Sequence, residues 1–165
     1  MDAQDEDDHA LDLHQFPGHL IRRLHQISVA QFTEKVAAHD IDLTPGQYAA
    51  MKAIDANPGI DQASVAGLIA YDRATLGKVI DRLEAKQLID RTVSPRDRRA
   101  RQLTLTETGK EVLARAHPLV REVQGEILTG LSPEEQEQFM ALLQKATAAG
   151  NERSRAPLRR PPRQS

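Results

Sequence analysis

The sequence predicts a mainly α-helical fold with a small β-wing. Apolar residues recur at three- and four-residue intervals over most of the chain, which is typical of amphipathic helices. Only between residues 88 and 106 does the pattern change to the two-residue alternation of strands. Two short helices, a turn and a hairpin follow one another between residues 60 and 109. This order indicates a winged helix-turn-helix, and we expect six helices with a wing of two to three strands.

The composition excludes several classes of protein. The 165 residues carry a net charge of −2 and are 39% hydrophobic, which is ordinary for one globular domain. No segment approaches the ~20 consecutive apolar residues of a membrane span, and the N-terminus lacks the features of a signal peptide, so we expect a cytoplasmic location. Cysteine is absent, which excludes disulfides and thiolate zinc sites. Because no nucleophile with an adjacent base, phosphate loop or metal motif is present, we expect neither an enzyme nor a cofactor.

The first two helices have clear boundaries. Apolar residues at helical spacing predict a long first helix from residue 16 to about residue 39. Thr44 is a suitable N-cap, with Pro45 at the first helical position and Gln47 three residues after the cap. This combination starts the second helix, which ends at the turn-forming residues 57–59.

The next two helices form the helix-turn-helix. Asp61 can cap the first of them, and Asp72 can cap the second because its carboxylate can accept hydrogen bonds from the free N–H groups of the first turn. One face of the second helix is an apolar stripe of Leu76, Val79, Ile80 and Leu83. The opposite face carries cationic and small residues, which the major groove of DNA accepts: Arg73, Thr75, Gly77, Lys78 and Arg82, with Asp81 among them.

A basic hairpin follows the second of these helices. Alternating apolar residues on either side of Ser94-Pro95-Arg96-Asp97-Arg98-Arg99 predict two strands joined by a polar, arginine-rich tip. Between Arg73 and Arg101 there are nine Lys/Arg and four Asp/Glu, so this segment carries +5 while the whole protein carries −2. Contact with the phosphates of a nucleic acid requires such a concentration of positive charge.

The wing sequence resembles the signature of a known family. The tip, followed by Leu103-Thr104-Leu105-Thr106 and Gly109, is similar to the wing of the MarR (multiple antibiotic resistance regulator) family of bacterial transcription factors. The shared pattern is an Asp, any residue and an Arg, with Leu-Thr a few residues on, directly after a helix-turn-helix. The resemblance implies a MarR-like domain over residues 16–148 that regulates transcription by binding double-stranded DNA, with a winged helix-turn-helix core over about 44–106.

The second helix of the helix-turn-helix, here called the recognition helix, supplies five of the candidate DNA contacts. Arg73 is the best placed for a bidentate contact to guanine, and Thr75 and Lys78 are expected to reach base edges as well. Gly77 would allow close approach of the backbone, and Arg82 is expected to touch phosphate. The alternative is that this face is an ordinary solvated helix surface.

The wing supplies most of the other candidate DNA contacts. The resemblance implies that Arg99 enters the minor groove and that Asp97 holds Arg99 by a charge-assisted hydrogen bond. The remaining candidates are expected to contact phosphate: Ser64, Arg96, Arg98 and Arg101. Ser64 could equally be a surface serine.

Two further helices follow the wing and favour a dimer. Thr106 or Glu107 opens a long helix, and Ser132 caps a last one that starts with a Pro and two acids. With the first helix they carry more apolar residues than the compact DNA-reading part can cover. In the resembled family the terminal helices of two chains pack into a two-fold dimer, which places two recognition helices about one DNA turn (~34 Å) apart on a palindromic site. We therefore expect a homodimer formed by helices over about 16–39 and 107–148.

Both ends of the chain are predicted to be disordered. Residues 1–15 form an arm with six acidic residues and no Lys or Arg, and residues 149–165 form a tail with five arginines and three prolines. Segments of this kind bury too little apolar surface to offset the entropy lost on ordering. We interpret them as tails without a specific role. The alternatives are that the arm mimics phosphate and that the tail adds nonspecific attraction to phosphate.

A ligand site is expected but its place is open. The resembled family often binds small aromatic or phenolic carboxylates between the dimer helices and the DNA-reading part. The residues that could line such a site come from the first two helices: His14, His19, Arg22, Arg23, Tyr48 and Met51. His19 and Arg23 fall one turn apart and could together bind the carboxylate of an aromatic acid or a thioester effector. The alternative is that these are surface or interface residues, and no histidine spacing predicts a metal site.

The sequence therefore indicates a dimeric, sequence-specific regulator of transcription. We expect a repressor that leaves a palindromic operator when a small aromatic or phenolic ligand binds. The alternative is a nonresponsive or architectural DNA-binding protein that carries the wing without a working pocket. The two differ in whether any ligand changes the affinity for DNA.

Overall fold

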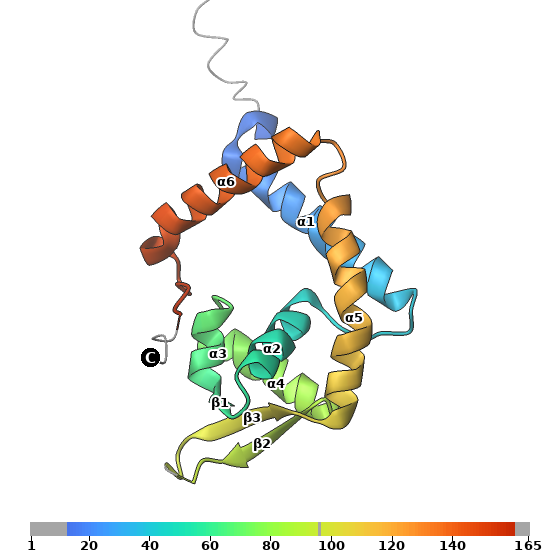
Figure 1. Cartoon of the computed structure of the whole chain (residues 1–165). Coiled ribbons are helices and arrows are strands. Elements are labelled where there is room, and N and C mark those ends of the chain that lie inside the picture. Colours follow the sequence, from blue (N-terminus) through green and yellow to red (C-terminus); the bar gives the residue numbers. More distant parts are fainter. Residues whose placement is uncertain (1–12, 96, 161–165) are drawn as a thin grey trace, which may run out of the picture.

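The computed structural model describes residues 13–95 and 97–160 (Figure 1). The α-helices of this part of the chain are α1 (Pro17–Ala37), α2 (Pro45–Ala56), α3 (Gln62–Leu68), α4 (Arg73–Ala85), α5 (Glu107–Glu126) and α6 (Pro133–Gly150). The strands are β1 (Ile60–Asp61), β2 (Ile89–Val93) and β3 (Arg101–Leu105), and the short 3-10 helices are η1 (Leu13–Gln15) and η2 (Asn151–Arg153). The predicted winged helix-turn-helix fold is confirmed. None of the described helices is long and apolar enough to cross a membrane.

The helices begin where the sequence places side-chain caps. Thr44 and Ser132 each form a capping box with the residue three positions on, at the starts of α2 and α6. At the start of α3 the carboxylate of Asp61 accepts from the backbone N–H of Ser64 at 2.9 Å, and Asp72 does the same for Thr75 at the start of α4. These bonds satisfy N–H groups that have no partner within the helix.

The wing is a three-stranded antiparallel sheet in the order β1-β3-β2. Ile60 pairs with Leu103, and Ile89 pairs with Leu105. The central strand β3 therefore joins the segment before α3 to the strand after α4. The tip between β2 and β3 extends beyond the helices (Figure 1).

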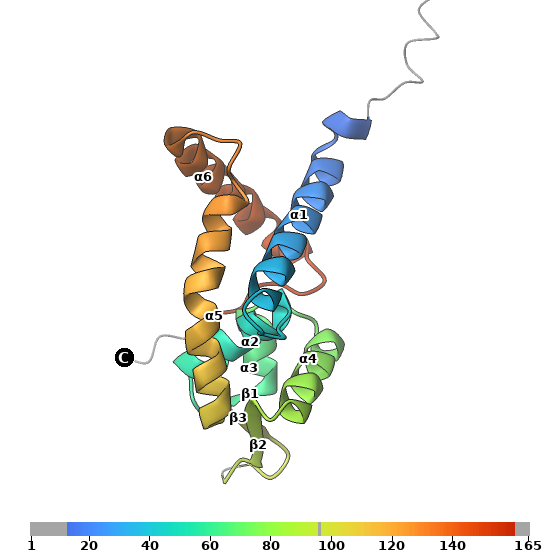
Figure 2. The same cartoon turned by 90° about the vertical axis from the view of Figure 1, so that its right-hand side faces the viewer.

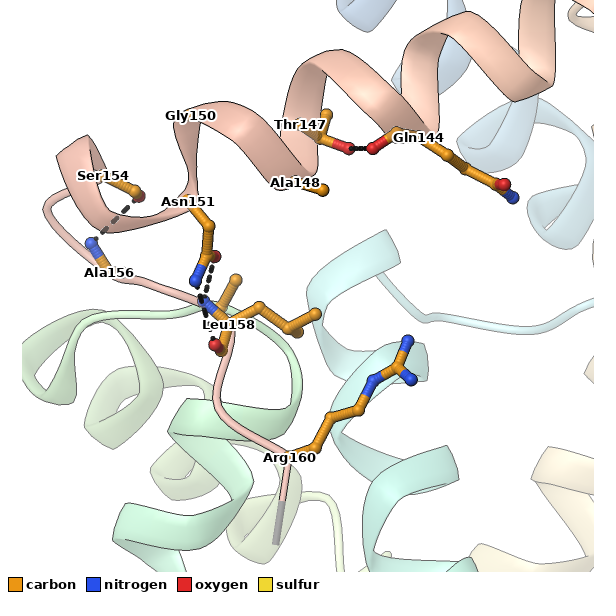
Figure 3. Close-up of a pocket in the computed structure, with 10 residues that line it drawn as sticks. Gln144, Thr147, Ala148, Gly150, Asn151, Ser154, Ala156, Leu158 and Arg160 are labelled. Carbon is orange, nitrogen blue, oxygen red and sulfur yellow. Dashed lines mark hydrogen bonds between the residues drawn. The ribbon is translucent and has the colours of Figure 1, made fainter.

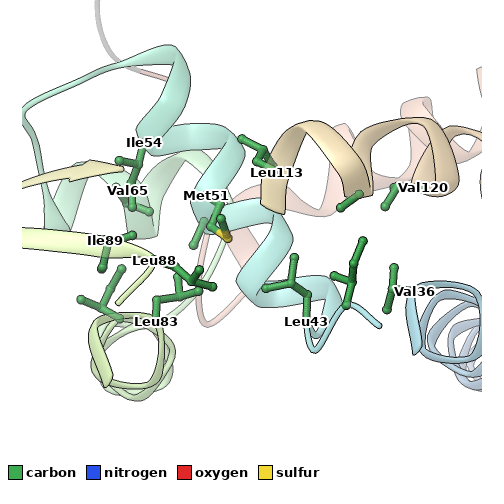
Figure 4. Packing of buried hydrophobic residues seen from close by; sticks show 14 of the residues in the cluster. Val36, Leu43, Met51, Ile54, Val65, Leu83, Leu88, Ile89, Leu113 and Val120 are labelled. Atoms are coloured by element: carbon green, nitrogen blue, oxygen red, sulfur yellow. The ribbon is translucent and has the colours of Figure 1, made fainter. Parts of the chain in front are cut away.

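The core is centred on α2. Met51 and Ile54 are fully buried, with Val65 of α3 and Leu83 of α4 on one side and Leu113 of α5 on the other (Figure 4). Met51, which was expected to line a ligand site, lies fully buried in this core in the single chain. Helical spacing shows which residues share a face, but not which neighbouring elements close over that face.

The C-terminal end of the chain differs from the predicted disorder. Helix α6 runs to Gly150, η2 follows, and the chain then returns to α3, where the backbone N–H of Arg159 donates to the carbonyl of Gly67 at 2.8 Å. Composition predicted disorder for 149–165, but specific acceptors order residues 149–160. At the N-terminal end, η1 lies within the predicted acidic arm. Residues 1–12 and 161–165 lie outside the described part of the chain.

Two elements extend beyond the winged helix-turn-helix. In Figures 1 and 2 the N-terminal half of α1 and the whole of α6 project from the far end of α5, and Figure 2 shows that they diverge from one another. Helix α6 has no buried residue over its 18 positions.

Candidate nucleic-acid interface

Helix α4 is fixed in the fold through one face and exposed through the other. The fixed face consists of three fully buried side chains, Leu76, Ile80 and Leu83. Arg73, Lys78 and Arg82 are exposed, as predicted. Lys78 and Arg82 are one turn apart on the same side, whereas Arg73 lies about 140° round the helix from Lys78 because five residues separate them. Arg73 therefore extends from the N-terminal end of α4 rather than from the side shared by the other two.

The caps occupy two hydroxyl groups that were expected at the DNA surface. The hydroxyl of Ser64 donates to Asp61 at 2.6 Å, and that of Thr75 donates to Asp72 at 2.7 Å. Ser64 therefore does not have the free hydroxyl hydrogen that donation to phosphate was predicted to use. Hydrogen bonds from the backbone and hydroxyl of Thr75, with the charge of Arg155, hold the pKa of the Asp72 carboxyl below its ordinary value.

Gly77 is placed differently from the prediction. It is half-buried, and a Cβ atom added there would lie 3.6 Å from Nε2 of Gln62 in α3. This is ordinary van der Waals contact with α3. Gly77 therefore faces the neighbouring helix, and the structure gives no reason to assign it to close approach of a DNA backbone.

The tip of the wing is a hydrogen-bonded turn. The carboxylate of Asp97 accepts from the backbone N–H of Arg99 at 2.9 Å, and the carbonyl of Asp97 accepts from the N–H of Ala100 at 3.0 Å. An Asp that binds the backbone two residues on is a common way to close a turn. The predicted bond from Asp97 to the Arg99 side chain is thus replaced by a bond to its backbone. Arg98, Arg99 and Arg101 are exposed, and Arg96 lies outside the described residues.

An arginine that the sequence analysis did not single out connects the wing to α4. Nη2 of Arg91 in β2 lies 2.6 Å from Oδ1 of Asp81 and 3.2 Å from Oε2 of Glu84. The Arg91 side chain is 22% exposed, so the pair is partly shielded from solvent. These two ion pairs link the wing to the recognition helix.

One group of predicted ligand residues lies at the start of α1. The rings of His14 and His19 pack edge to face with centroids 5.3 Å apart, and Nη2 of Arg22 lies 3.4 Å from Nδ1 of His19. Loss of solvent, then the charges of Arg22, His14 and Arg23, lower the pKa of His19. Within residues 13–95 and 97–160, Nε2 of His19 is shielded from solvent and has no hydrogen-bond partner.

Tyr48, in α2, lies near the C-terminal end of α1. Its Oη atom is hydrogen-bonded to Nδ1 of His117 in α5 at 2.8 Å, and its ring packs against Phe32 of α1 with centroids 6.1 Å apart. Phe32 is 13 residues after His19, which is roughly 20 Å along a helix. The predicted ligand residues therefore do not converge within one chain. The Tyr48–His117 pair joins residues 69 positions apart, which no local sequence pattern signals.

The cavity shown in Figure 3 lies elsewhere, between the end of α6, the residues after it and Ala70 in the turn of the helix-turn-helix. Its volume is about 1000 Å³, and it is open to solvent. None of the predicted ligand residues lines it. In the described part of the chain, no three His, Asp or Glu side chains come together where they could hold a metal ion.

A supported helix with an exposed cationic side, joined to a basic β-wing, defines a winged-helix DNA-binding protein. Comparison with known proteins gives the same class. The family model described as the MarR family matches residues 43–100. The transcriptional regulator HosA of Escherichia coli O111:H- is 39% identical over 127 residues, which cover 77% of this chain and 91% of HosA.

Two solved structures are also similar. The PcaV transcriptional regulator from Streptomyces coelicolor, in complex with its natural ligand, has a TM-score of 0.77 and 32% identity over 86% of this chain and 98% of PcaV. Bordetella bronchiseptica BpsR, reported with a mechanism for regulation of its DNA binding by 6-hydroxynicotinic acid, has a TM-score of 0.74 and 31% identity over 81% of this chain and 94% of BpsR. The chain belongs to the MarR family and is a DNA-binding transcriptional regulator, not an enzyme. The predicted family is thereby confirmed.

Proposed function

We propose that this regulator is a homodimeric repressor that binds a palindromic operator and is released by a small aromatic or phenolic carboxylate. The observation that carries the proposal is the combination, in one chain, of an exposed cationic recognition helix and two helices, α1 and α6, that each expose large apolar side chains. The first provides the contact with DNA. The second provides the contact with another copy of the chain, which a two-fold operator requires.

The dimer is inferred from the exposed apolar residues of α1 and α6. Exposed apolar patches often mark sites of contact between proteins. In α1, Ile21 is 62% exposed and Leu20 is 47% exposed. In α6, Leu142 is 58% exposed and Met140 is 42% exposed. A second copy that packs α1 and α6 against the same helices of the first would remove these side chains from water.

Contacts with DNA are divided between α4 and the wing. Arg73, at the N-terminal end of α4, and Lys78 reach base edges, and Arg82 contacts the DNA backbone. Arg99 enters the minor groove from the wing, where Asp97 fixes its backbone position. The ion pairs of Arg91 join these two parts.

Release by a ligand is inferred from the relatives and from the Tyr48–His117 pair. PcaV is described with its natural ligand, and 6-hydroxynicotinic acid, which regulates BpsR, is a hydroxylated aromatic acid. Tyr48 and His117 join α2 of the DNA-reading part to α5, which leads to the proposed dimer helices. A ligand that exchanges hydrogen bonds here would change how α5 meets the DNA-reading part. A tenfold loss of DNA affinity requires only ~1.4 kcal/mol of differential binding.

The proposed reading of DNA is tested by two arginine variants of equal charge change. Arg73→Ala is expected to alter base preference at one position of each half-site, at a cost of about 1–3 kcal/mol for the preferred base. Arg82→Ala is expected to weaken all sequences alike and to lower the salt dependence of binding. Binding to a library of duplexes, repeated at several salt concentrations, measures both effects. If the two variants give the same base preferences and the same salt dependence, the division into a base reader and a phosphate contact is wrong.

A further inference from the structure

The C-terminal segment (residues 151–160) forms a closed loop after α6. The side chain of Asn151 donates to the carbonyl of Leu158 at 3.3 Å and accepts from the N–H of Leu158 at 2.8 Å (Figure 3). The carboxylate of Glu152 accepts two hydrogen bonds from the guanidinium of Arg159, at 2.5 and 2.9 Å. Two adjacent residues at the start of the loop thus hold two adjacent residues at its end. This arrangement gives the loop a defined shape.

The loop is attached to the helix-turn-helix by close backbone contact. The N–H of Arg159 donates to the carbonyl of Gly67 near the end of α3 at 2.8 Å. A Cβ atom at position 67 would lie 2.9 Å from Cβ of Arg159, closer than such atoms normally approach. The contact therefore depends on a glycine in α3, and it fixes the C-terminal segment beside the turn that leads into α4.

Arg155 lies at the start of the recognition helix. Its Nη2 atom is 3.1 Å from Oδ2 of Asp72, the residue that caps α4. Asp72 is 27% exposed, and its negative charge would repel a phosphate that approached this end of α4. Arg155 offsets that charge, and because its own side chain is 87% exposed, its other N–H groups are available to an outside acceptor.

The charge of the C-terminal segment is continuous with that of α4. The segment contains four arginines and one glutamate, which gives it a net charge of +3. Arg73 directly follows Asp72 in the chain, so Arg155 and Arg73 both lie next to the cap of α4. An ordered cationic surface beside a recognition helix has the charge that suits a DNA strand.

We propose that the C-terminal segment is part of the DNA-binding surface and that Arg155 binds a backbone phosphate next to the N-terminal end of α4. The proposal rests on the proposed function, in which α4 and the wing contact the DNA. The phosphate belongs to the DNA duplex and not to a free anion. Arg155 adds affinity without base preference, because a phosphate contact carries no sequence information.

The test compares two arginines of this segment in the full-length protein. Arg155→Ala is expected to weaken binding to a DNA duplex about tenfold, as the loss of a charged hydrogen bond predicts. The slope of log affinity against log salt concentration should fall by about 0.9 for each protomer that loses the contact. Arg153→Ala removes the same charge from η2 of the same segment and should change the affinity less than about twofold. Arg155→Lys should retain most of the salt dependence.

Each outcome decides the proposal. A normal salt slope for Arg155→Ala, with or without weaker binding, would overturn it, since Arg155 would then at most hold the fold together. Equal losses for Arg155→Ala and Arg153→Ala would also overturn it, because the effect would come from the general charge of the segment. Inorganic phosphate added to the parent protein should not displace the DNA by more than its ionic strength explains. Failure of the parent protein to bind any duplex would contradict the proposed function itself.

Discussion

An Ile21→Asp variant is expected to be a folded monomer that no longer binds the operator tightly. Ile21 is 62% exposed in the single chain, so the substitution should cost the monomer little. In the proposed dimer the same side chain lies between apolar helices, where an unpaired carboxylate is strongly unfavourable. Loss of the second recognition helix should weaken operator binding by roughly 100-fold or more. Light scattering gives the molar mass, circular dichroism the helix content, and DNA titration the affinity.

Gln26→Asp is the matched control. It places a carboxylate on the same helix, about 140° round the axis from Ile21, on a side with no exposed large apolar residue. This variant should remain dimeric and bind DNA. A dimeric Ile21→Asp protein, or two variants that behave alike, would contradict an interface built on the apolar side of α1.

Gly109→Ala is expected to destabilise the protein by about 3 kcal/mol. Gly109 lies in the first turn of α5, and an added Cβ atom would overlap the carbonyl oxygen of Leu88. That oxygen already accepts the N–H of Thr106, so neither backbone can move without loss of a hydrogen bond. Unfolding in urea at a fixed protein concentration measures the free energy of unfolding.

Gly125→Ala, in the same helix, should have the opposite sign. A Cβ atom at position 125 meets nothing within 4 Å, so the substitution should stabilise the helix by roughly 0.5–1 kcal/mol through backbone entropy. Equal destabilisation by both alanines would show that the close contact at Leu88 is not what position 109 depends on.

Local signals in the sequence predicted the framework well. A cap and the hydrogen bonds that it makes lie within three residues of one another, so Thr44, Asp61, Asp72 and Ser132 each mark a helix start that the structure confirms. The change from helical to alternating periodicity likewise located β2 and β3. The fold class follows from these signals and their order.

Contacts between distant residues were not predictable in the same way. Arg155 and Asp72 are 83 residues apart, and nothing in the composition of an arginine-rich end indicates that it is ordered against a helix cap. The fully buried position of Met51 depends on which helices close over α2, which periodicity does not show. For the same reason, the six residues that suit a ligand site by type do not lie together. Four lie at the start of α1, Tyr48 lies near the other end of α1, and Met51 lies in the core.

The most direct test of the account is binding of the purified protein to the DNA just upstream of its own coding region, titrated with a panel of aromatic acids and thioesters. The account predicts tight, salt-dependent binding that one hydroxylated aromatic acid or related compound weakens at least tenfold. Tight binding that no compound changes would contradict release by such a ligand and favour a nonresponsive DNA-binding protein. No binding to this region would contradict an operator at the protein's own gene.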